Sequence, residues 1–294
     1  MIHEVFEQAV LKGLGADSYK HETHIQSLWS GYGSIDRIRV NNGIYETAIL
    51  KRISPMKTTR AQSSLSHQRK LNSYKIEIEF YKRFSGQCDD NCRVPAFISA
   101  LTHDEEHIII LEDLDRAGFP LRRHSLTKKQ ENACLRWLAY FHARFMNVQP
   151  EGLWDIGTYW HLDTRQEEFH KMPSGTLKEN AHAYDTLLNK AQFKTLVHGD
   201  AKPANFCFSA DDGVAAVDFQ YVGGGCGMKD ITYFFWGDTP QNEHEYLETY
   251  FNYLDEALNH YGSAIDFPAL KQEWSELYPV AKADFHRFLQ GWML

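Results

Sequence analysis

Residues 1–112 carry mainly the short apolar runs that are typical of β-strands. Within them, residues 27–54 contain two β-branched stretches joined by Asn-Asn-Gly, which favours a hairpin turn. Two more strands are predicted at 94–101 and 107–114, with the polar turn 102–106 between them. The pattern therefore predicts four strands in this part of the chain.

One segment among these strands has a different period. Apolar residues within 67–84 recur at the spacing of one helix face, with charged residues between them. They are Leu71, Tyr74, Ile78 and Tyr81. This segment is predicted to be a helix.

The rest of the chain is predicted to be mostly helical. The expected helices are 127–146, 178–193, 242–261 and 268–290. Residues 195–220 are the exception, because they have the pattern of two strands around a loop. The sequence thus indicates an α+β protein with a small β-rich lobe (1–112) and a larger, mainly helical lobe (113–294), joined by a hinge at about 111–118.

Composition narrows the class of protein. The 294 residues are 43% hydrophobic and 24% charged, as in ordinary globular proteins, and no apolar run approaches the ~20 residues of a membrane span. Five cysteines, an odd number, favour reduced thiols over a disulfide framework. A net charge of −8 argues against nucleic acid as a partner. We therefore expect a cytoplasmic protein that binds neither membranes nor nucleic acid.

The negative charge is concentrated at the end of the chain. Residues 236–294 hold ten Asp and Glu against three Lys and Arg, and they also hold twelve aromatic residues. One interpretation is a solvated acidic face on terminal helices. The other is an acidic, partly aromatic pocket, which would attract a cationic or neutral substrate and repel an anionic one.

The candidate chemistry lies in "LVHGDAKPANFCFS" (196–209) and in the strand "VAAVD" that follows. Asp200 can accept the proton of an attacking hydroxyl, while the amide oxygen of Asn205 can ligate Mg²⁺ from the same loop. Asp218 offers a second hard oxygen ligand. Lys202 can place its ammonium on a transferring phosphoryl group. The alternative is a purely structural turn, in which the Asp and Asn side chains only form hydrogen bonds with the backbone.

These motifs resemble the catalytic and metal-binding loops of the aminoglycoside phosphotransferase and choline kinase superfamily, and most closely its ecdysteroid-kinase-like branch. Four other segments also resemble that branch: 73–81, 108–114, 223–234 and 283–292. The resemblance implies a bilobal protein-kinase-like fold. It also implies ATP as the phosphoryl donor, Mg²⁺, and the hydroxyl of a small molecule as the acceptor.

The resemblance also implies roles for individual residues. Asp200 would be the catalytic base, with Asn205 and Asp218 as the magnesium ligands. Lys51, on a predicted strand, would bind the α- and β-phosphates and pair with Glu77 of the following helix. Glu79 is the competing partner, and only one of the two acids can face Lys51.

Nucleotide contacts are also expected from two backbone segments. The hinge residues Glu112 and Leu114 would present backbone C=O and N–H groups to adenine. Gly31, Gly33 and Ser34 occupy the position of a phosphate-covering glycine loop. A tight strand turn explains these three residues equally well, because Asp36 stands where a protein kinase has its third glycine.

The region around the motif separates a small-molecule kinase from a regulated protein kinase. Eleven residues, 219–229, lie between Asp218 and Asp230, too few for a phosphorylated activation loop. Asp230 is expected to brace the catalytic loop through backbone hydrogen bonds, and His198 is expected to be structural.

The leading hypothesis is therefore an ATP- and Mg²⁺-dependent kinase of a hydroxylated small molecule. The alternatives are a pseudokinase that binds nucleotide without turnover and, less favoured, a protein kinase. The sequence does not choose among steroid, choline-like and aminoglycoside acceptors.

Overall fold

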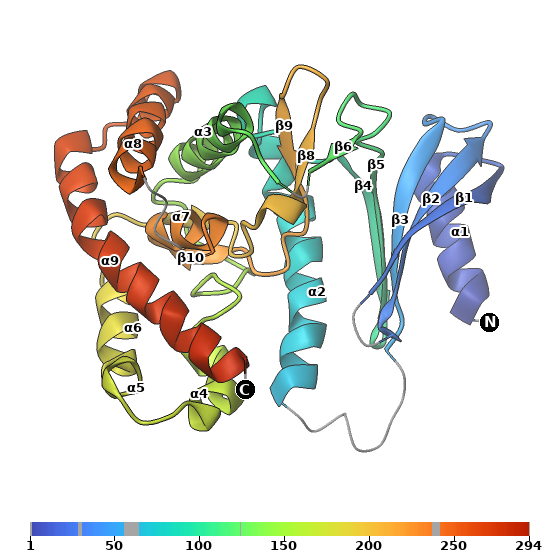
Figure 1. Ribbon diagram of the computed structural model, residues 1–294. Helices are drawn as coiled ribbons and strands as arrows, with labels where there is room; N and C mark the ends of the chain where they lie inside the picture. Colours follow the sequence, from blue (N-terminus) through green and yellow to red (C-terminus); the bar gives the residue numbers. More distant parts are fainter. Residues whose placement is uncertain (1, 29–30, 56–64, 124, 237–241, 294) are drawn as a thin grey trace.

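The computed structural model describes residues 2–28, 31–55, 65–123, 125–236 and 242–293. An antiparallel sheet occupies one side of the molecule and most of the helices occupy the other, with α2 (Leu65–Arg83) standing between them (Figure 1). The fold is α+β and bilobal, as predicted. None of the helices in the described residues is both long enough and apolar enough to cross a membrane.

The smaller lobe is built on a five-stranded sheet with the order β1-β2-β3-β5-β4, in which every neighbouring pair is antiparallel. Its strands are β1 (Ser18–Ser27), β2 (Gly33–Asn41), β3 (Thr47–Ile53), β4 (Phe97–His103) and β5 (Glu106–Glu112). The β2–β3 and β4–β5 hairpins confirm the four strands predicted from the sequence. β5 ends at Glu112, and we propose the boundary between the lobes there.

Two elements of this lobe were not predicted. β1 is an edge strand whose residues are almost all exposed, so it lacks the alternation of apolar and polar residues that marks a half-buried strand. Helix α1 (Ile2–Leu14) covers the outer face of the sheet. Its buried residues Phe6, Val10 and Leu14 recur every four positions, which is a helical signal.

The alternation of side chains along β3 sets the direction of Lys51. Ala48 and Leu50 pack in the cluster beneath α1. Lys51 and Ile53 project from the opposite face, because successive residues of a strand point to opposite sides. Ile53 there joins the core cluster that contains Tyr74 of α2.

Helix α2 connects the two lobes. Of its predicted apolar residues, Tyr74, Ile78 and Tyr81 are buried and Leu71 is partly buried. The ring of Phe80 stacks on Phe219 of the larger lobe with the centroids 3.9 Å apart. The rotation of α2 about its axis is therefore fixed by contacts with both lobes.

The larger lobe is mainly helical, as predicted. Its helices are α3 (Lys128–Arg144), α4 (Gln166–Lys171), α5 (Thr176–Glu179), α6 (Ala181–Asn189), α7 (Met228–Phe234), α8 (Glu243–His260) and α9 (Phe267–Trp292). α3, α8 and α9 confirm three predicted helices, while the predicted helix 178–193 is the shorter α6. The short helices α4, α5 and α7 were not predicted individually.

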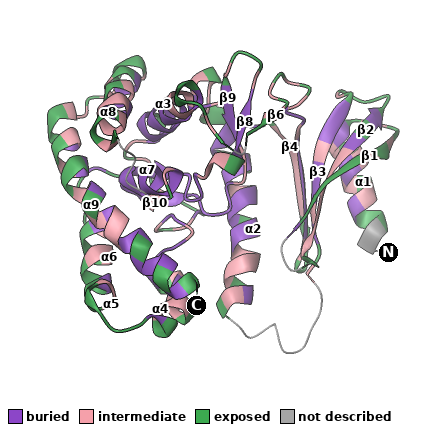
Figure 2. Cartoon of the chain, viewed as in Figure 1, coloured by how far each residue is buried: buried purple, intermediate pink, exposed green. Residues whose placement is uncertain are grey.

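Short buried strands carry the motif, in the region predicted as strand-loop-strand. β6 (Leu121–Arg122), β8 (Phe206–Phe208) and β9 (Val214–Ala216) form one sheet, and β7 (Thr195–Val197) pairs with β10 (Gly223–Gly225). β7, β8, β9 and α7 are buried throughout, so the loops between them start from rigid supports (Figure 2).

Candidate functional site

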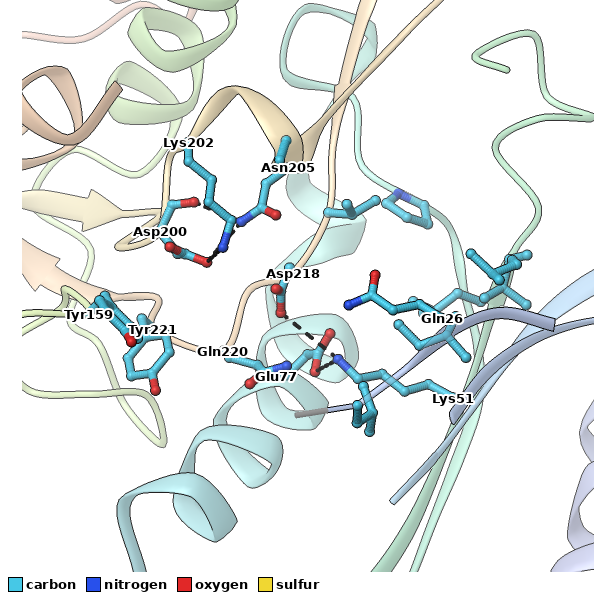
Figure 3. Close-up of a pocket in the computed structure, with 18 of the residues that line it drawn as sticks. Gln26, Lys51, Glu77, Tyr159, Asp200, Lys202, Asn205, Asp218, Gln220 and Tyr221 are labelled. Atoms are coloured by element: carbon cyan, nitrogen blue, oxygen red, sulfur yellow. Dashed lines mark hydrogen bonds and ion pairs between the residues drawn. The ribbon is translucent and has the colours of Figure 1, made fainter. Parts of the chain in front are cut away.

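A cavity of about 930 Å³ collects most of the predicted site residues. Those that line it are Lys51, Glu77, Glu112, Leu114, Asp200, Lys202, Asn205 and Asp218. They come from β3, α2, the end of β5 and the loops after β7 and β9, and the close-up in Figure 3 shows several of them facing one another.

Lys51 and Glu77 form a buried ion pair at the smaller lobe's side of the cavity. Nζ of Lys51 lies 2.6 Å from Oε2 of Glu77, and both side chains are buried (Figure 3). Burial raises the pKa of Glu77, and the charge of Lys51 opposes this rise. Glu79 instead lies 4.0 Å from Lys82 with its side chain 38% exposed, so the partner of Lys51 is Glu77.

Asp200 lies in the loop after β7 and is held by two neighbours from the same loop. Its Oδ2 accepts hydrogen bonds from Lys202 Nζ (2.9 Å) and from Asn205 Nδ2 (3.0 Å). Its Oδ1 is buried and has no partner of ordinary hydrogen-bond geometry among the described residues, while the hydroxyl of Tyr233 also interacts with this carboxylate. Burial raises the pKa of Asp200, while the nearby charge of Lys202 lowers it. This arrangement leaves one carboxylate oxygen able to accept a proton.

Asp230 holds the loop from behind. Its two carboxylate oxygens accept hydrogen bonds from the backbone N–H groups of His198 (2.6 Å) and Gly199 (2.9 Å). This confirms the bracing predicted for Asp230. Gly199 has a φ of 79°, and a Cβ there would lie 2.0 Å from the carbonyl oxygen of Tyr221, so only glycine fits.

His198 is structural, as predicted. It is fully buried, and its Nδ1 accepts from the backbone N–H of Asp200 at 3.3 Å. Its Nε2 therefore carries the hydrogen and donates to the carbonyl oxygen of Val217 at 3.0 Å. The ring thus joins the loop of Asp200 to the residue that precedes Asp218.

Asp218 has a backbone conformation that suits a functional residue. Its φ is 70°, in the left-handed region that residues other than glycine rarely adopt. Oδ1 is buried without a hydrogen-bond partner among the described residues, and Lys51 Nζ lies 3.9 Å away. Burial opposes ionisation, but the charges of Lys51, Lys202 and Lys70 prevail and lower the pKa of Asp218.

The oxygens of this group fit a hard divalent cation. The Asn205 amide donates through Nδ2 to Asp200, which leaves its oxygen for another partner (Figure 3). Asp218 contributes a carboxylate oxygen with no other hydrogen bond among the described residues. Mg²⁺ prefers such oxygen ligands and is usually held by one or two protein groups together with substrate phosphates.

The three predicted glycine-loop residues do not line the cavity, although Tyr32 and Ile35 beside them do. Gly31, Gly33 and Ser34 lie in the turn between β1 and β2 and in the first residues of β2. A Cβ on Gly33 would lie 1.9 Å from the carbonyl oxygen of Arg52, so the close approach of β3 alone requires glycine there. Gln26 of β1 instead points into the cavity (Figure 3). Contact between these three residues and a nucleotide stays a prediction.

The hinge has one free backbone donor. The side chain of Glu112 pairs with Arg93, and its backbone N–H donates to the carbonyl oxygen of Ala96. The backbone N–H of Leu114 donates to no other described residue. Both residues line the cavity, and contact between their backbone groups and adenine stays a prediction.

The other end of the cavity, beside Asp200, is aromatic and basic. Its aromatic residues are Tyr159, Tyr221, Tyr233, Trp236 and Trp292, and its basic residues are Arg69, Lys70 and Arg165. Arg165 is buried against the ring of Tyr159, at 3.9 Å from the centroid. Trp236 and Trp292 belong to the aromatic segment noted in the sequence, whereas the others were missed because most come from loops and helix ends with no local motif.

The acidic pocket that was one of two interpretations of residues 236–294 finds no support in the described residues, although the segment does contribute aromatic residues to the cavity. Of the described residues in that segment, only Trp236 and Trp292 line the cavity, and neither is acidic. The acids lie elsewhere on α8 and α9; Glu243, for example, pairs with Lys282 at 2.6 Å. The structure therefore supports the other interpretation, in which the charge belongs to the surface of terminal helices.

The sequence model of the ecdysteroid kinase-like family matches residues 155–263. The match confirms the resemblance predicted from the sequence, and it includes Asp200, Asn205 and Asp218. Lys51 and Glu77 lie outside it. No curated protein matches the chain in sequence.

Solved structures are similar to this chain at low identity. Macrolide 2′-phosphotransferase MphH from Brachybacterium faecium matches with a TM-score of 0.52 and 13% identity, over 94% of this chain and 88% of that chain. Aminoglycoside phosphotransferase APH(3″)-Id from Streptomyces rimosus, in complex with ADP and streptomycin, gives 0.48 and 15% over 96% and 99%. Choline kinase LicA from Streptococcus pneumoniae gives 0.47 and 13% over 99% and 97%. The match to MphH shows a common fold.

Proposed function

We propose that this protein, whose residues 155–263 match the ecdysteroid kinase-like family, transfers the γ-phosphoryl group of ATP to the hydroxyl of a small molecule. The observation that carries the proposal is the convergence of Lys51, Glu77, Asp200, Asn205 and Asp218 on one cavity. Phosphoryl transfer needs these groups together, because its catalysis consists mainly of positioning and of stabilising negative charge.

Asp200 is the proposed base. Its Oδ1 accepts the proton of the acceptor hydroxyl. The hydroxyl oxygen then forms a bond to the γ-phosphorus while the bond between that phosphorus and the β-phosphate oxygen breaks. Lys202, already 2.9 Å from Oδ2 of Asp200, stabilises negative charge on the transferring group. Lys51, fixed by Glu77, binds the α- and β-phosphates.

Asn205 and Asp218 are the proposed magnesium ligands. The amide of Asn205 donates to Asp200 through its nitrogen, which leaves its oxygen for a ligand, and Oδ1 of Asp218 has no hydrogen-bond partner among the described residues. Both residues line the cavity. When bound, Mg²⁺ would neutralise part of the negative charge of the phosphates. Asp218 is held in place for this role because Phe219, the next residue, stacks on Phe80 of α2.

A small-molecule acceptor is favoured over a protein by the short segment after Asp218. Residues 223–225 pair with β7, and a Cβ on Gly223 would lie 2.1 Å from the carbonyl oxygen of Trp154. The segment is therefore packed into the core and leaves no length for a regulated activation loop. We propose that the acceptor enters beside Tyr159 and Tyr221, next to Asp200 (Figure 3).

A screen of hydroxylated compounds tests the proposal. The protein is incubated with Mg·ATP and a panel of steroid alcohols, choline and aminoglycosides, and products are followed by phosphorus NMR and mass spectrometry. A kinase yields a phosphorylated acceptor and an equal amount of ADP. Binding of ATP without any product across a broad panel would favour the pseudokinase alternative.

A further inference from the structure

Helix α2 carries a second charged residue toward the cavity. Lys70 lies seven residues before Glu77, which is about two helical turns, so both side chains project from the same face. Both line the cavity. Tyr74, fully buried, lies between them on that face.

Lys70 and Lys51 approach the same aromatic ring. Nζ of Lys70 lies 5.1 Å from the centroid of Tyr74, and Nζ of Lys51 lies 5.6 Å from it. Lys70 also reaches Gln220, with 3.5 Å between Nζ and Oε1. Gln220 is two residues after Asp218, so the ammonium of Lys70 lies next to the proposed metal loop.

Lys70 differs from the other two lysines of the site in its partners. Lys51 is paired with Glu77 at 2.6 Å and Lys202 with Asp200 at 2.9 Å. Among the residues that the structure describes, no carboxylate lies within 4.0 Å of Nζ of Lys70. Its one hydrogen bond, to the neutral Gln220, is at the limit of length.

A partly buried ammonium without a close carboxylate is suited to bind an anion. Burial and the charge of Lys51 lower the pKa of Lys70, while the negative charges of Asp218, Glu77 and Asp200 act in the opposite direction. A ligand oxygen with negative charge would supply the charge-assisted hydrogen bonds that Gln220 does not. Such a ligand would lie in the cavity between Asp218 and the loop that carries Asp200.

We propose that Lys70 is a third phosphate-binding lysine, which contacts the terminal phosphate of a bound nucleoside triphosphate. The proposal rests on the proposed function, because that function puts a triphosphate in this cavity. Lys51, Lys70 and Lys202 then surround Asp218 from β3, α2 and the catalytic loop. A contact from Lys70 to the terminal phosphate joins α2 to the loop that carries Asp200.

The test compares nucleotides that differ only in phosphate number. Affinities for Mg·ATP, Mg·ADP and AMP are measured by titration calorimetry for the wild type and for Lys70→Met, Lys70→Gln and Lys70→Arg. Lys75→Met is the matched control, because Lys75 is an exposed lysine of the same helix. Circular dichroism confirms that each variant is folded, and Lys70→Gln replaces Lys70→Met if that variant does not fold.

Loss of the charge is expected to weaken Mg·ATP about tenfold or more and to leave AMP within about twofold. Lys70→Arg should restore most of the loss, and Lys75→Met should bind all three nucleotides as the wild type does. Equal weakening of ATP and AMP, or no weakening, overturns the role of Lys70 while leaving the proposed function in place. A wild-type protein that binds none of the three nucleotides overturns both.

Discussion

Nζ of Lys51 lies 2.6 Å from Oε2 of Glu77, and the two side chains are only 6% and 3% exposed. The pair joins the central strand β3 to helix α2 inside the smaller lobe. It holds the ammonium of Lys51 at the edge of the cavity, 3.9 Å from Asp218. A contact inside the smaller lobe therefore also positions the ammonium that is proposed to bind phosphates.

Removing one member of this pair should be more harmful than removing both. Lys51→Met leaves a carboxylate buried without its partner, which lowers the free energy of unfolding by about 3–5 kcal/mol. The double variant Lys51→Met/Glu77→Leu should recover part of that loss, as urea unfolding can show. The matched control is Lys82→Met, whose exposed pair with Glu79 contributes about 0.5 kcal/mol or less. If Lys51→Met is no more harmful than the control, the pair does not stabilise the fold.

Asp230 is predicted to stabilise the fold rather than to take part in the reaction. Asp230→Ala leaves the N–H groups of His198 and Gly199 buried without acceptors, together with Nε2 of His142, which lies 3.0 Å from Asp230. The free energy of unfolding should fall by about 3 kcal/mol or more. The exposed Asp211→Ala serves as control. Equal stabilities of the two variants in guanidinium unfolding would contradict the bracing role.

Local spacing allowed the catalytic loop to be predicted. Asp200, Lys202 and Asn205 lie within six consecutive residues, so a single turn brings their side chains together whatever surrounds them. The choice between Glu77 and Glu79 could not be made in that way. It depends on the rotation of α2, which the stacking of Phe80 on Phe219 sets through a contact 139 residues apart in the chain.

The residues at the end of the cavity beside Asp200 could not be predicted either, because they too are brought together by contacts between distant parts of the chain. Net charge along the sequence allowed an acidic pocket as one of two interpretations, but Arg69, Lys70 and Arg165 arrive at the cavity from other parts of the chain. Charge counted over a segment says nothing about which side chains face inward. Of these residues, only Lys70 could have been placed beside Glu77 from the sequence, because it lies seven residues before Glu77 on a predicted helix.

His107 should make stability depend on pH. Its side chain is buried, with Nδ1 3.0 Å from Thr102 Oγ1, and burial, assisted by the charge of Lys75, lowers the pKa of His107 to about 4. The unfolded value is about 6.5. Between these values the unfolded chain binds a proton that the folded chain does not, so stability is present above about pH 6.5 and is lost as the pH falls toward 4.

The variant His107→Gln isolates this contribution. Between pH 7 and pH 4.5 the wild type should lose about 2 kcal/mol more free energy of unfolding than the variant. Urea titrations at the two pH values provide the comparison. Identical losses in both proteins would show that His107 is not a source of the pH dependence.

Magnesium should bind tightly only together with nucleotide. Asn205 and Asp218 are too few ligands to enclose the ion alone. Titration of Mg²⁺ into the protein should give no tight binding without ATP, and Asp218→Asn should lose the increase in ATP affinity that Mg²⁺ gives. Asparagine tolerates the left-handed backbone at this position, so the variant should keep its fold. Tight binding of Mg²⁺ in the absence of nucleotide would contradict this site.

The central claim is that Asp200 accepts the proton of the acceptor hydroxyl. The most direct measurement compares wild type and Asp200→Asn for two quantities: the turnover of the best acceptor from the screen, and the affinity for Mg·ATP. The substitution preserves size and removes the basic oxygen, so kcat should fall by about 10²–10⁴-fold while Mg·ATP still binds. A variant that keeps turnover within a few-fold of wild type would contradict the account.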